Sequence, residues 1–167
     1  MAVNGIDSIN AKLIEELQKD ARTSVAELGR RVGLSAPAVA ERLQRLEGEG
    51  VIRGYRADVN PRALGYALSA VLRIRPAPRQ LPKVAELARK TPEVVECHRV
   101  TGEDCFYMEL HVRSIEELEE LIDSFLIYGT TTTSIIQSSP VQRRALPLEP
   151  IGAKTEAGKD AGSKLGE

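Results

Sequence analysis

Three amphipathic segments open the chain, and each follows a residue type that caps helices well. Apolar residues recur at positions 9, 13, 14 and 17, then at 25, 28 and 32, and then at 39, 43 and 46. This spacing is typical of helices that bury one side. Asp7, Ser24 and Ser35 stand just before the three stripes, where their side-chain oxygens can accept backbone N–H groups. The pattern predicts three helices within the first 49 residues.

The second and third of these helices are joined by a short glycine turn. In S-V-A-E, Ser24 and Glu27 have the form of a capping box, and Gly33 stands where a helix C-terminus turns left-handed. Pro37 falls in the first turn of the next helix, where its missing N–H loses nothing. Gly29 leaves the first helix of the pair smooth enough for the second to cross closely. The spacing predicts a helix-turn-helix, and the alternative is an ordinary helical hairpin with a solvated basic face.

The period changes after residue 50. Residues 51–59 are β-prone and turn at Gly54, which favours a small hairpin or wing whose Arg53 and Arg56 would flank the DNA backbone. Strand patterns at residues 66–75, 94–101, 105–112 and 131–141 alternate with helical patterns at 81–90 and after Ser114. The order β-α-β-β-α-β predicts an α+β fold with a ferredoxin-like module. The predicted domains are 1–60 (helix-turn-helix), 61–65 (linker), 66–148 (βαββαβ) and 149–167, a polar tail expected to be disordered or ordered only by partner chains.

A ferredoxin-like sheet carries both helices on one face, so its other face is open to a partner. If Gly102-Glu103 is a two-residue turn, Thr101 pairs with Asp104. That register assigns to the open face Glu96, His98, Cys105, Tyr107, Glu109 and His111. It assigns to the helix side Val95, Cys97, Phe106, Met108, Leu110 and Val112. We therefore predict no bond between the two cysteines and a two-fold dimer contact on the open face, with simple exposure to solvent as the alternative.

Charge is distributed unevenly along the 167 residues. The whole chain has a net charge of −1, but residues 22–56 hold seven arginines against four glutamates, a local net charge of +3. A basic patch of this kind can bind DNA even in a neutral protein, although a solvated charged face is equally compatible with it.

Other classes of function have weaker support in the sequence. No apolar run approaches a membrane span and no signal peptide is recognisable, so we expect a cytoplasmic location. Two cysteines are too few for a disulfide framework, and no zinc-site spacing occurs, so no metal or cofactor is predicted. An enzyme or a standalone sensor built on the ferredoxin-like module is the alternative. Its candidate side chains are Cys97, His98, Cys105 and His111, which form no suggestive nucleophile-base set.

Several motifs together resemble the leucine-responsive regulatory protein/AsnC family, the feast/famine transcription regulators. They are I-D-S-I-N-A-K-L from Ile6, V-G-L-S from Val32, E-R-L-Q-R-L-E from Glu41, V-I-R-G-Y from Val51, Asn60-Pro61, V-E-C-H from Val95 and T-G-E-D-C-F from Thr101. The resemblance covers about residues 5–147. It implies a sequence-specific regulator that binds double-stranded DNA and forms homodimers and larger oligomers such as octamers. It also implies an amino-acid effector bound between dimers.

Two groups of site residues follow from the motifs and the resemblance. The predicted DNA-binding residues are Ser24, Ser35, Pro37, Ala38, Glu41, Arg42, Gln44, Arg45, Arg53 and Arg56. The predicted effector-binding residues are Thr101, Gly102, Glu103, Asp104, Cys105, Phe106, Thr131, Thr132, Thr133 and Ser134. Family members commonly show Gly-x-x-Asp-Tyr in this loop, and Cys105 stands where the aspartate is usual. A tight turn with solvated acids and β-branched threonines at a strand edge are the simpler alternatives.

Overall fold

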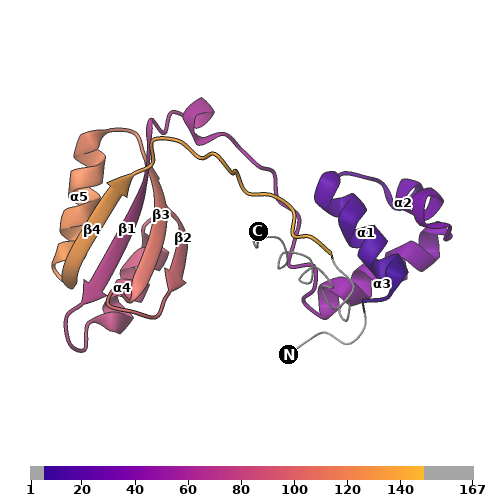
Figure 1. Ribbon diagram of the computed structural model, residues 1–167, viewed down its shortest axis with the longest axis horizontal. Helices are drawn as coiled ribbons and strands as arrows, with labels where there is room; N and C mark the ends of the chain where they lie inside the picture. The colour runs from indigo at the N-terminus through magenta and orange to yellow at the C-terminus, as the bar shows by residue number, and fades with distance from the viewer. Residues whose placement is uncertain (1–5, 149–167) are drawn as a thin grey trace, which may run out of the picture. The chain divides into compact units, whose positions relative to one another are not determined.

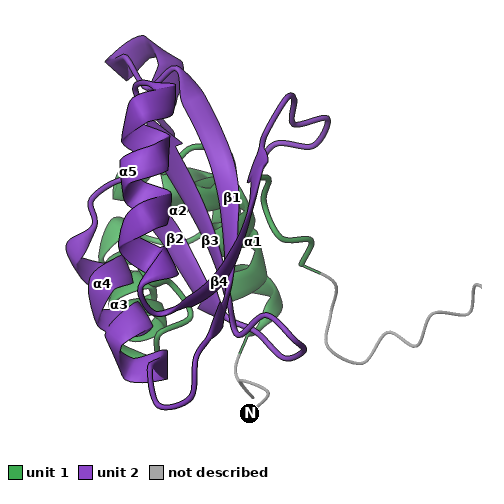
Figure 2. Ribbon diagram, turned by 90° about the vertical axis from the view of Figure 1, so that its left-hand side faces the viewer, with its two compact units in different colours: residues 1–56, 143–167 green, residues 57–142 purple. Residues whose placement is uncertain are grey.

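The computed structural model describes residues 6–148, which divide into two compact units (Figures 1 and 2). The first unit contains residues 6–56 together with 143–148, and the second contains residues 57–142. The chain thus leaves the first unit after Arg56 and returns to it at Arg143. The predicted tail, 149–167, lies outside the described residues. None of the helices within residues 6–148 combines the length and the hydropathy that a bilayer span requires.

The first unit is built from three helices, α1 (Ser8–Lys19), α2 (Val25–Val32) and α3 (Ala36–Gly48). The three predicted caps are present: Asp7, Ser24 and Ser35 each accept a hydrogen bond from the backbone N–H three residues later. The reciprocal contact of the capping box, from the Ser24 backbone N–H to the Glu27 carboxylate, does not form, because this carboxylate pairs with Arg30 and Arg31 instead. The apolar stripes meet in a core of Leu13, Leu28, Val39 and Leu43.

The turn between α2 and α3 depends on two glycines. Gly33 has a φ of 74°, in the left-handed region, and the N–H of Leu34 donates to the Gly29 carbonyl at 2.9 Å. A Cβ on Gly29 would lie 2.6 Å from the Leu34 carbonyl oxygen. The predicted close approach at Gly29 is therefore confirmed, and the atoms that approach it belong to the backbone of the turn.

The second unit has the predicted β-α-β-β-α-β order. After a short 3-10 helix (Pro61–Leu64) come β1 (Leu68–Pro76), α4 (Leu81–Lys90), β2 (Val94–Arg99), β3 (Phe106–Val112), α5 (Ile115–Leu126) and β4 (Gly129–Ile135). The sheet order is β2-β3-β1-β4 and every neighbouring pair is antiparallel. The central strands β1 and β3 are thus contributed by both halves of the module, as the split βαβ plan requires.

Both helices of this unit cover the same face of the sheet (Figure 2). Alternate residues of the central strands point into the core, including Leu72 and Ile74 from β1 and Met108 and Leu110 from β3. Phe125 from α5 is fully buried against them. The intervening residues of each strand lie on the opposite face, which no helix or strand of the second unit covers.

Two predicted strand segments are wrong. No strand forms in residues 51–59, because the N–H groups of Val51 and Ile52 both fold back onto the Leu46 carbonyl and the following residues have no partner strand. The last strand ends at Ile135 instead of continuing to residue 141. Its partner β1 begins at Leu68, and beyond the Ile136 N–H bond to the Ser69 carbonyl no ladder remains to extend.

The β2–β3 register is the predicted one, although the turn is longer. His98 pairs with Tyr107 and Arg99 with Phe106, but the ladder stops there, so residues 100–105 form a loop in place of a two-residue turn. A bulge between Val94 and Glu96 leaves Val95 55% exposed, contrary to its predicted burial. Cys105 packs against the core, whereas the predicted register assigned it to the open face. Both cysteines are free thiols.

Candidate nucleic-acid interface and effector loop

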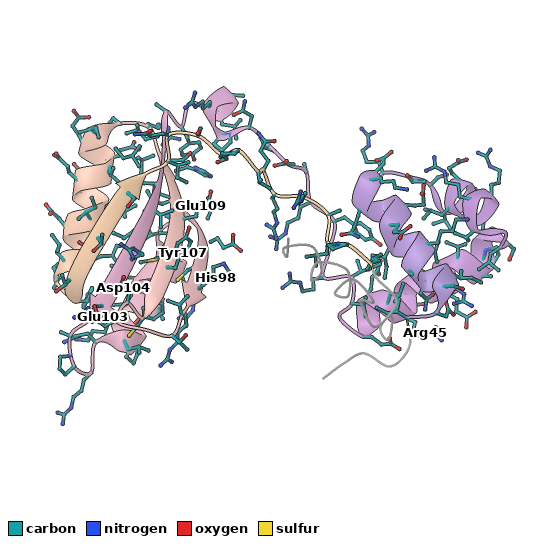
Figure 3. All side chains as sticks on the ribbon, viewed as in Figure 1. Arg45, His98, Glu103, Asp104, Tyr107 and Glu109 are labelled. Carbon is teal, nitrogen blue, oxygen red and sulfur yellow. The ribbon has the colours of Figure 1, made fainter. Side chains whose placement is uncertain are left out.

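Helix α3 has one buried side and one exposed polar side. Val39, Leu43 and Leu46 are buried, whereas Glu41, Gln44 and Arg45 are exposed. Figure 3 shows Arg45 on this helix. Ser35 and Pro37 are exposed at the start of the helix, and Ala38 is half-buried. Arg45 has only a long contact with Glu49, 3.9 Å between Nε and Oε1, so its guanidinium retains free donors. A helix with this arrangement can present side chains and its first turn to a DNA groove.

Arg42 differs from the other predicted DNA-binding arginines because its guanidinium is hydrogen-bonded to two residues of the same unit. Its Nη1 donates to Asp7 Oδ2 at 2.6 Å and to Asn10 Oδ1 at 2.9 Å, which ties α3 to the beginning of α1. Asn10 is fully buried. The backbone N–H of Asn10, followed by the Arg42 guanidinium, holds the pKa of Asp7 below its usual value. The structure therefore gives Arg42 a positioning contact, which helical spacing alone did not indicate.

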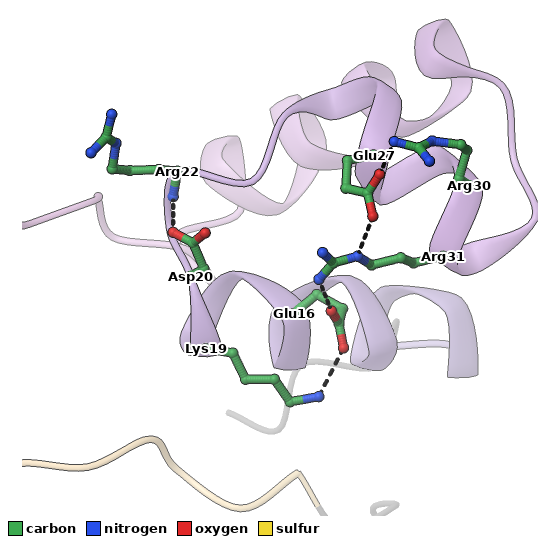
Figure 4. A network of polar contacts seen from close by, with 7 residues as sticks. All are labelled: Glu16, Lys19, Asp20, Arg22, Glu27, Arg30 and Arg31. Carbon is green, nitrogen blue, oxygen red and sulfur yellow. Dashed lines mark hydrogen bonds and ion pairs between the residues drawn. The ribbon is translucent and has the colours of Figure 1, made fainter.

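Ion pairs also connect α1 to α2 (Figure 4). Glu16 accepts from Lys19 at 2.8 Å and from Arg31 at 2.5 Å, and Arg31 reaches Glu27 at 2.8 Å. Arg30 pairs with Glu27 as well. Part of the local positive charge is thus compensated within the unit, so the cations available for phosphate are fewer than the sequence count suggests.

The segment after α3 is fixed at its tyrosine. Tyr55 Oη donates to Glu47 Oε1 at 2.8 Å, and burial, followed by this hydrogen bond, raises the pKa of Tyr55 to about 12. Arg53 and Arg56, on either side, are exposed and have no ion-pair partner among residues 6–148. Ser24 is exposed as the cap of α2. Ser24, Arg53 and Arg56 are therefore all exposed on the first unit, although the predicted wing is absent from residues 51–59.

The loop between β2 and β3 turns at a glycine and is held by backbone hydrogen bonds at its ends. Gly102 has a φ of 117°, and the loop is bounded by hydrogen bonds from Val100 N–H to the Cys105 carbonyl and from Cys105 N–H to the Ile74 carbonyl, both 2.9 Å. Thr101, Gly102 and Glu103 are exposed, Asp104 and Cys105 are half-buried, and Phe106 is buried. The loop offers polar backbone and acids at its rim, with its last residues anchored in the core.

Two arginines of β1 meet the acids of this loop. Arg73 Nη1 lies 3.4 Å from Asp104 Oδ2, and Arg75 pairs with Glu103. The register pairs Ile74 with Phe106, so the arginines on either side of Ile74 lie on the open face beside the loop. Neither arginine is among the predicted effector-binding residues. Their alternation with Leu72 and Ile74 was the signal that could have found them.

The four predicted hydroxyl residues of β4 do not share one surface. Thr131 and Thr133 alternate with Thr132 and Ser134; the first two are half-buried and the second two exposed. The Thr133 hydroxyl oxygen is buried without a hydrogen-bond partner among the described residues. In the sheet, β1 lies between β3 and β4, so these two strands are about 10 Å apart. Within one copy, Thr132 lies opposite Arg73 of β1, whose guanidinium reaches Asp104 of the loop, whereas Thr131 and Thr133 alternate onto the other face of the sheet.

The comparisons with known proteins settle the family. Residues 6–47 match the AsnC-type helix-turn-helix domain, and residues 69–146 match the Lrp/AsnC ligand binding domain. The chain belongs to the Lrp/AsnC family of transcriptional regulators. It is 36% identical over 146 residues to the HTH-type transcriptional regulator LrpA of Mycobacterium tuberculosis, an alignment that covers 85% of this chain and 97% of the relative.

Solved structures of other Lrp/AsnC regulators have the same fold. LrpC of Bacillus subtilis superimposes with a TM-score of 0.79 at 31% identity, over 83% of this chain and 99% of that one. The feast or famine regulatory protein of M. tuberculosis, solved in complex with L-methionine, gives a TM-score of 0.79 at 35% identity, over 86% of this chain and all of the other. These relatives are regulators of transcription, in agreement with the resemblance noted in the sequence.

Proposed function

We propose that this Lrp/AsnC regulator reads DNA through the exposed side of α3, with Arg45 and Gln44 approaching base edges and Ser35 meeting phosphate. The observation that supports this assignment most directly is the contrast between two arginines of the same helix. Arg42 is bonded to Asp7 and Asn10, whereas Arg45 is 55% exposed with free donors. An arginine that is bidentate to guanine contributes about 1–3 kcal/mol of discrimination between bases.

The two arginines give a matched test. Arg45→Ala is expected to weaken binding to a genomic site about 5- to 150-fold relative to random competitor DNA, with unfolding unchanged. Arg42→Ala removes a hydrogen-bond partner from buried Asn10 and is expected to lower the stability of the unit by about 1–3 kcal/mol. The measurements are competition binding at two salt concentrations and thermal unfolding. If Arg45→Ala binds its site with undiminished preference over random DNA, α3 is not the reading helix.

We also propose that the open face of the sheet forms a two-fold contact between two copies. His98, Tyr107 and Glu109 lie on this face with His111, whose Nδ1 is 2.8 Å from Ser69 Oγ (Figure 3). A face that mixes an aromatic ring with satisfied polar groups suits a subunit contact. Sedimentation of the protein and of Tyr107→Glu tests the proposal, with Glu119→Gln on the exposed surface of α5 as control. A dimer or larger assembly that survives Tyr107→Glu unchanged refutes it.

The effector proposed for the loop is a free amino acid. The L-methionine in the related M. tuberculosis structure supports this class of ligand. The loop and β1 offer both charges that a zwitterion requires: Arg73 and Arg75 for its carboxylate, and Asp104 and Glu103 for its ammonium. On β4, Thr132 pairs with Arg73 and so lies beside the proposed carboxylate site within one copy, whereas Thr131 and Thr133 alternate onto the other face of the sheet.

A thermal-shift screen with each of the twenty amino acids at millimolar concentration tests this effector. A ligand present at 100 times its Kd stabilises by about 2.7 kcal/mol. Asp104→Asn is expected to reduce the shift for the best ligand, whereas Glu119→Gln leaves it unchanged. Absence of a shift with all twenty amino acids would mean that the loop is structural and that no amino acid is the effector.

A further inference from the structure

Residues 143–148 follow the second module in sequence but are held in the first unit. The Leu146 backbone N–H donates to Gln18 Oε1 at 2.8 Å, and Gln18 Nε2 donates to the Leu146 carbonyl at 3.2 Å. The amide of Gln18 thus pairs with both backbone groups of one residue, as a neighbouring strand would. Residues 144–148 also line a cavity of about 380 Å³ with Glu15, Gln18 and Lys19 of α1.

This returning segment changes the charge of the DNA-binding unit. Residues 6–56 carry nine basic and eight acidic side chains, a net charge of +1. Arg143 and Arg144 raise it to +3. The match to the ligand binding domain extends to residue 146, but the fold groups residues 143–146 with the helix-turn-helix. The unit that binds DNA therefore obtains most of its net positive charge from the far end of the described chain.

The two arginines are also uncommitted. Four of the nine cations in residues 6–56 form close ion pairs with acids of the same unit, namely Lys19, Arg30, Arg31 and Arg42, and Arg45 has a long contact of 3.9 Å with Glu49. Arg143 and Arg144 are exposed, and neither has an ion pair or hydrogen bond with a residue in the described range 6–148. Unpaired, exposed cations are the groups that displace counterions from a phosphate backbone.

We propose that the returning segment is a second DNA-contacting element, in which Arg143 and Arg144 bind backbone phosphates and Gln18 positions them. The inference rests on DNA binding by the α3 unit. Each phosphate contact steepens the dependence of log Kobs on log salt by about 0.9. The pair should therefore account for a slope difference of about 1.8, which is about a 12-fold change in affinity between 50 and 200 mM salt.

The test is the salt dependence of binding by the full chain to a duplex site, followed by fluorescence anisotropy. Arg143→Gln/Arg144→Gln is expected to reduce the slope by about 1.8 without altering the preference among sequences. Arg79→Gln/Arg89→Gln is the control, because it removes the same charge from exposed positions of the second unit. Gln18→Ala is expected to reduce the slope in the wild-type background and to have no further effect in the double arginine variant.

The outcomes separate this inference from the α3 assignment. Suppose that wild type binds its site and that the slope for the double arginine variant equals the wild-type slope or falls no more than the slope for the control variant. The contact by residues 143–148 is then refuted, while the assignment of α3 as the reading helix is unaffected. A Gln18→Ala slope equal to that of wild type would refute the positioning role. If Arg45→Ala also fails to reduce site preference, the assignment of the DNA-binding unit fails as a whole. Circular dichroism of each variant verifies that the helices are intact.

Discussion

Gly29→Ala tests whether the turn between α2 and α3 is set by close backbone contact. The added Cβ would lie 2.6 Å from the Leu34 carbonyl oxygen, whereas non-bonded heavy atoms prefer about 3.5 Å or more. The neighbouring atom is backbone and belongs to the residue whose N–H donates to the Gly29 carbonyl. It must move by roughly 1 Å, in a turn whose geometry places α3.

Two opposing contributions determine the size of the effect. Overpacking costs about 1–3 kcal/mol, and replacing a helical glycine by alanine returns about 0.5–1 kcal/mol. The expected result is a net destabilisation of about 1–2 kcal/mol. Gly48→Ala is a matched control, because Gly48 is in α3 and a Cβ there meets nothing within 4 Å. That substitution should stabilise the unit by up to about 1 kcal/mol, so the two changes should have opposite signs.

Native-state hydrogen exchange resolves the effect within one unit of a two-unit chain. The amides of α2 and α3 should exchange about 5- to 30-fold faster in Gly29→Ala than in wild type, since 1.4 kcal/mol corresponds to a tenfold change. The amides of β1 and β3 serve as the internal reference and should not change. If Gly29→Ala protects α2 and α3 as well as Gly48→Ala does, the turn accommodates a side chain and the steric explanation is incorrect.

Three further predictions concern pH and the sheet. The lowered pKa of Asp7 contributes stability that is present above the unfolded pKa of about 3.9 and is lost as pH falls through the lower folded value. Asp7→Asn should make acid unfolding less steep, and an unchanged acid profile would contradict this. The pKa of about 12 for Tyr55 implies that the protein loses stability as pH rises from about 10 toward 12. In an ultraviolet titration, Glu47→Gln should lower the pKa of Tyr55, and an unchanged pKa would exclude the hydrogen bond between Tyr55 and Glu47. Gly129→Ala places a Cβ 2.8 Å from the Pro76 Cα and should accelerate amide exchange in β4, an effect absent if the ladder tolerates it.

The local elements were predictable because their determinants are local. Apolar spacing, three capping residues and the left-handed Gly33 define the three-helix unit, and period-two alternation gives the register of β2 with β3. The family resemblance then supplied the function. The predicted strand segments that failed were the ones that lacked a partner strand. Residues 51–59 have strand propensity but no partner to pair with, and residues beyond 135 run past the end of β1.

The candidate sites were less predictable for the same reason. Whether an arginine is free or engaged depends on which residues lie beside it in the fold. Arg42 is 35 residues from Asp7 in sequence, and Arg75 is 28 residues from Glu103, and no spacing rule connects either pair. Gln18 and Leu146 are separated by 128 residues. Residue types and periodicity gave the faces of the helices and strands, but not these long-range partners.

The strand order also determines when each part of the protein can be completed during synthesis. Because β1 pairs with β4, the ribosome must release the chain through Ile135 before the sheet can close, and the helical unit has emerged long before. That unit acquires its final piece later still, when Leu146 reaches Gln18. A nascent chain that stalls after the third helix would therefore display the helix-turn-helix while lacking both the sheet module and the last two arginines.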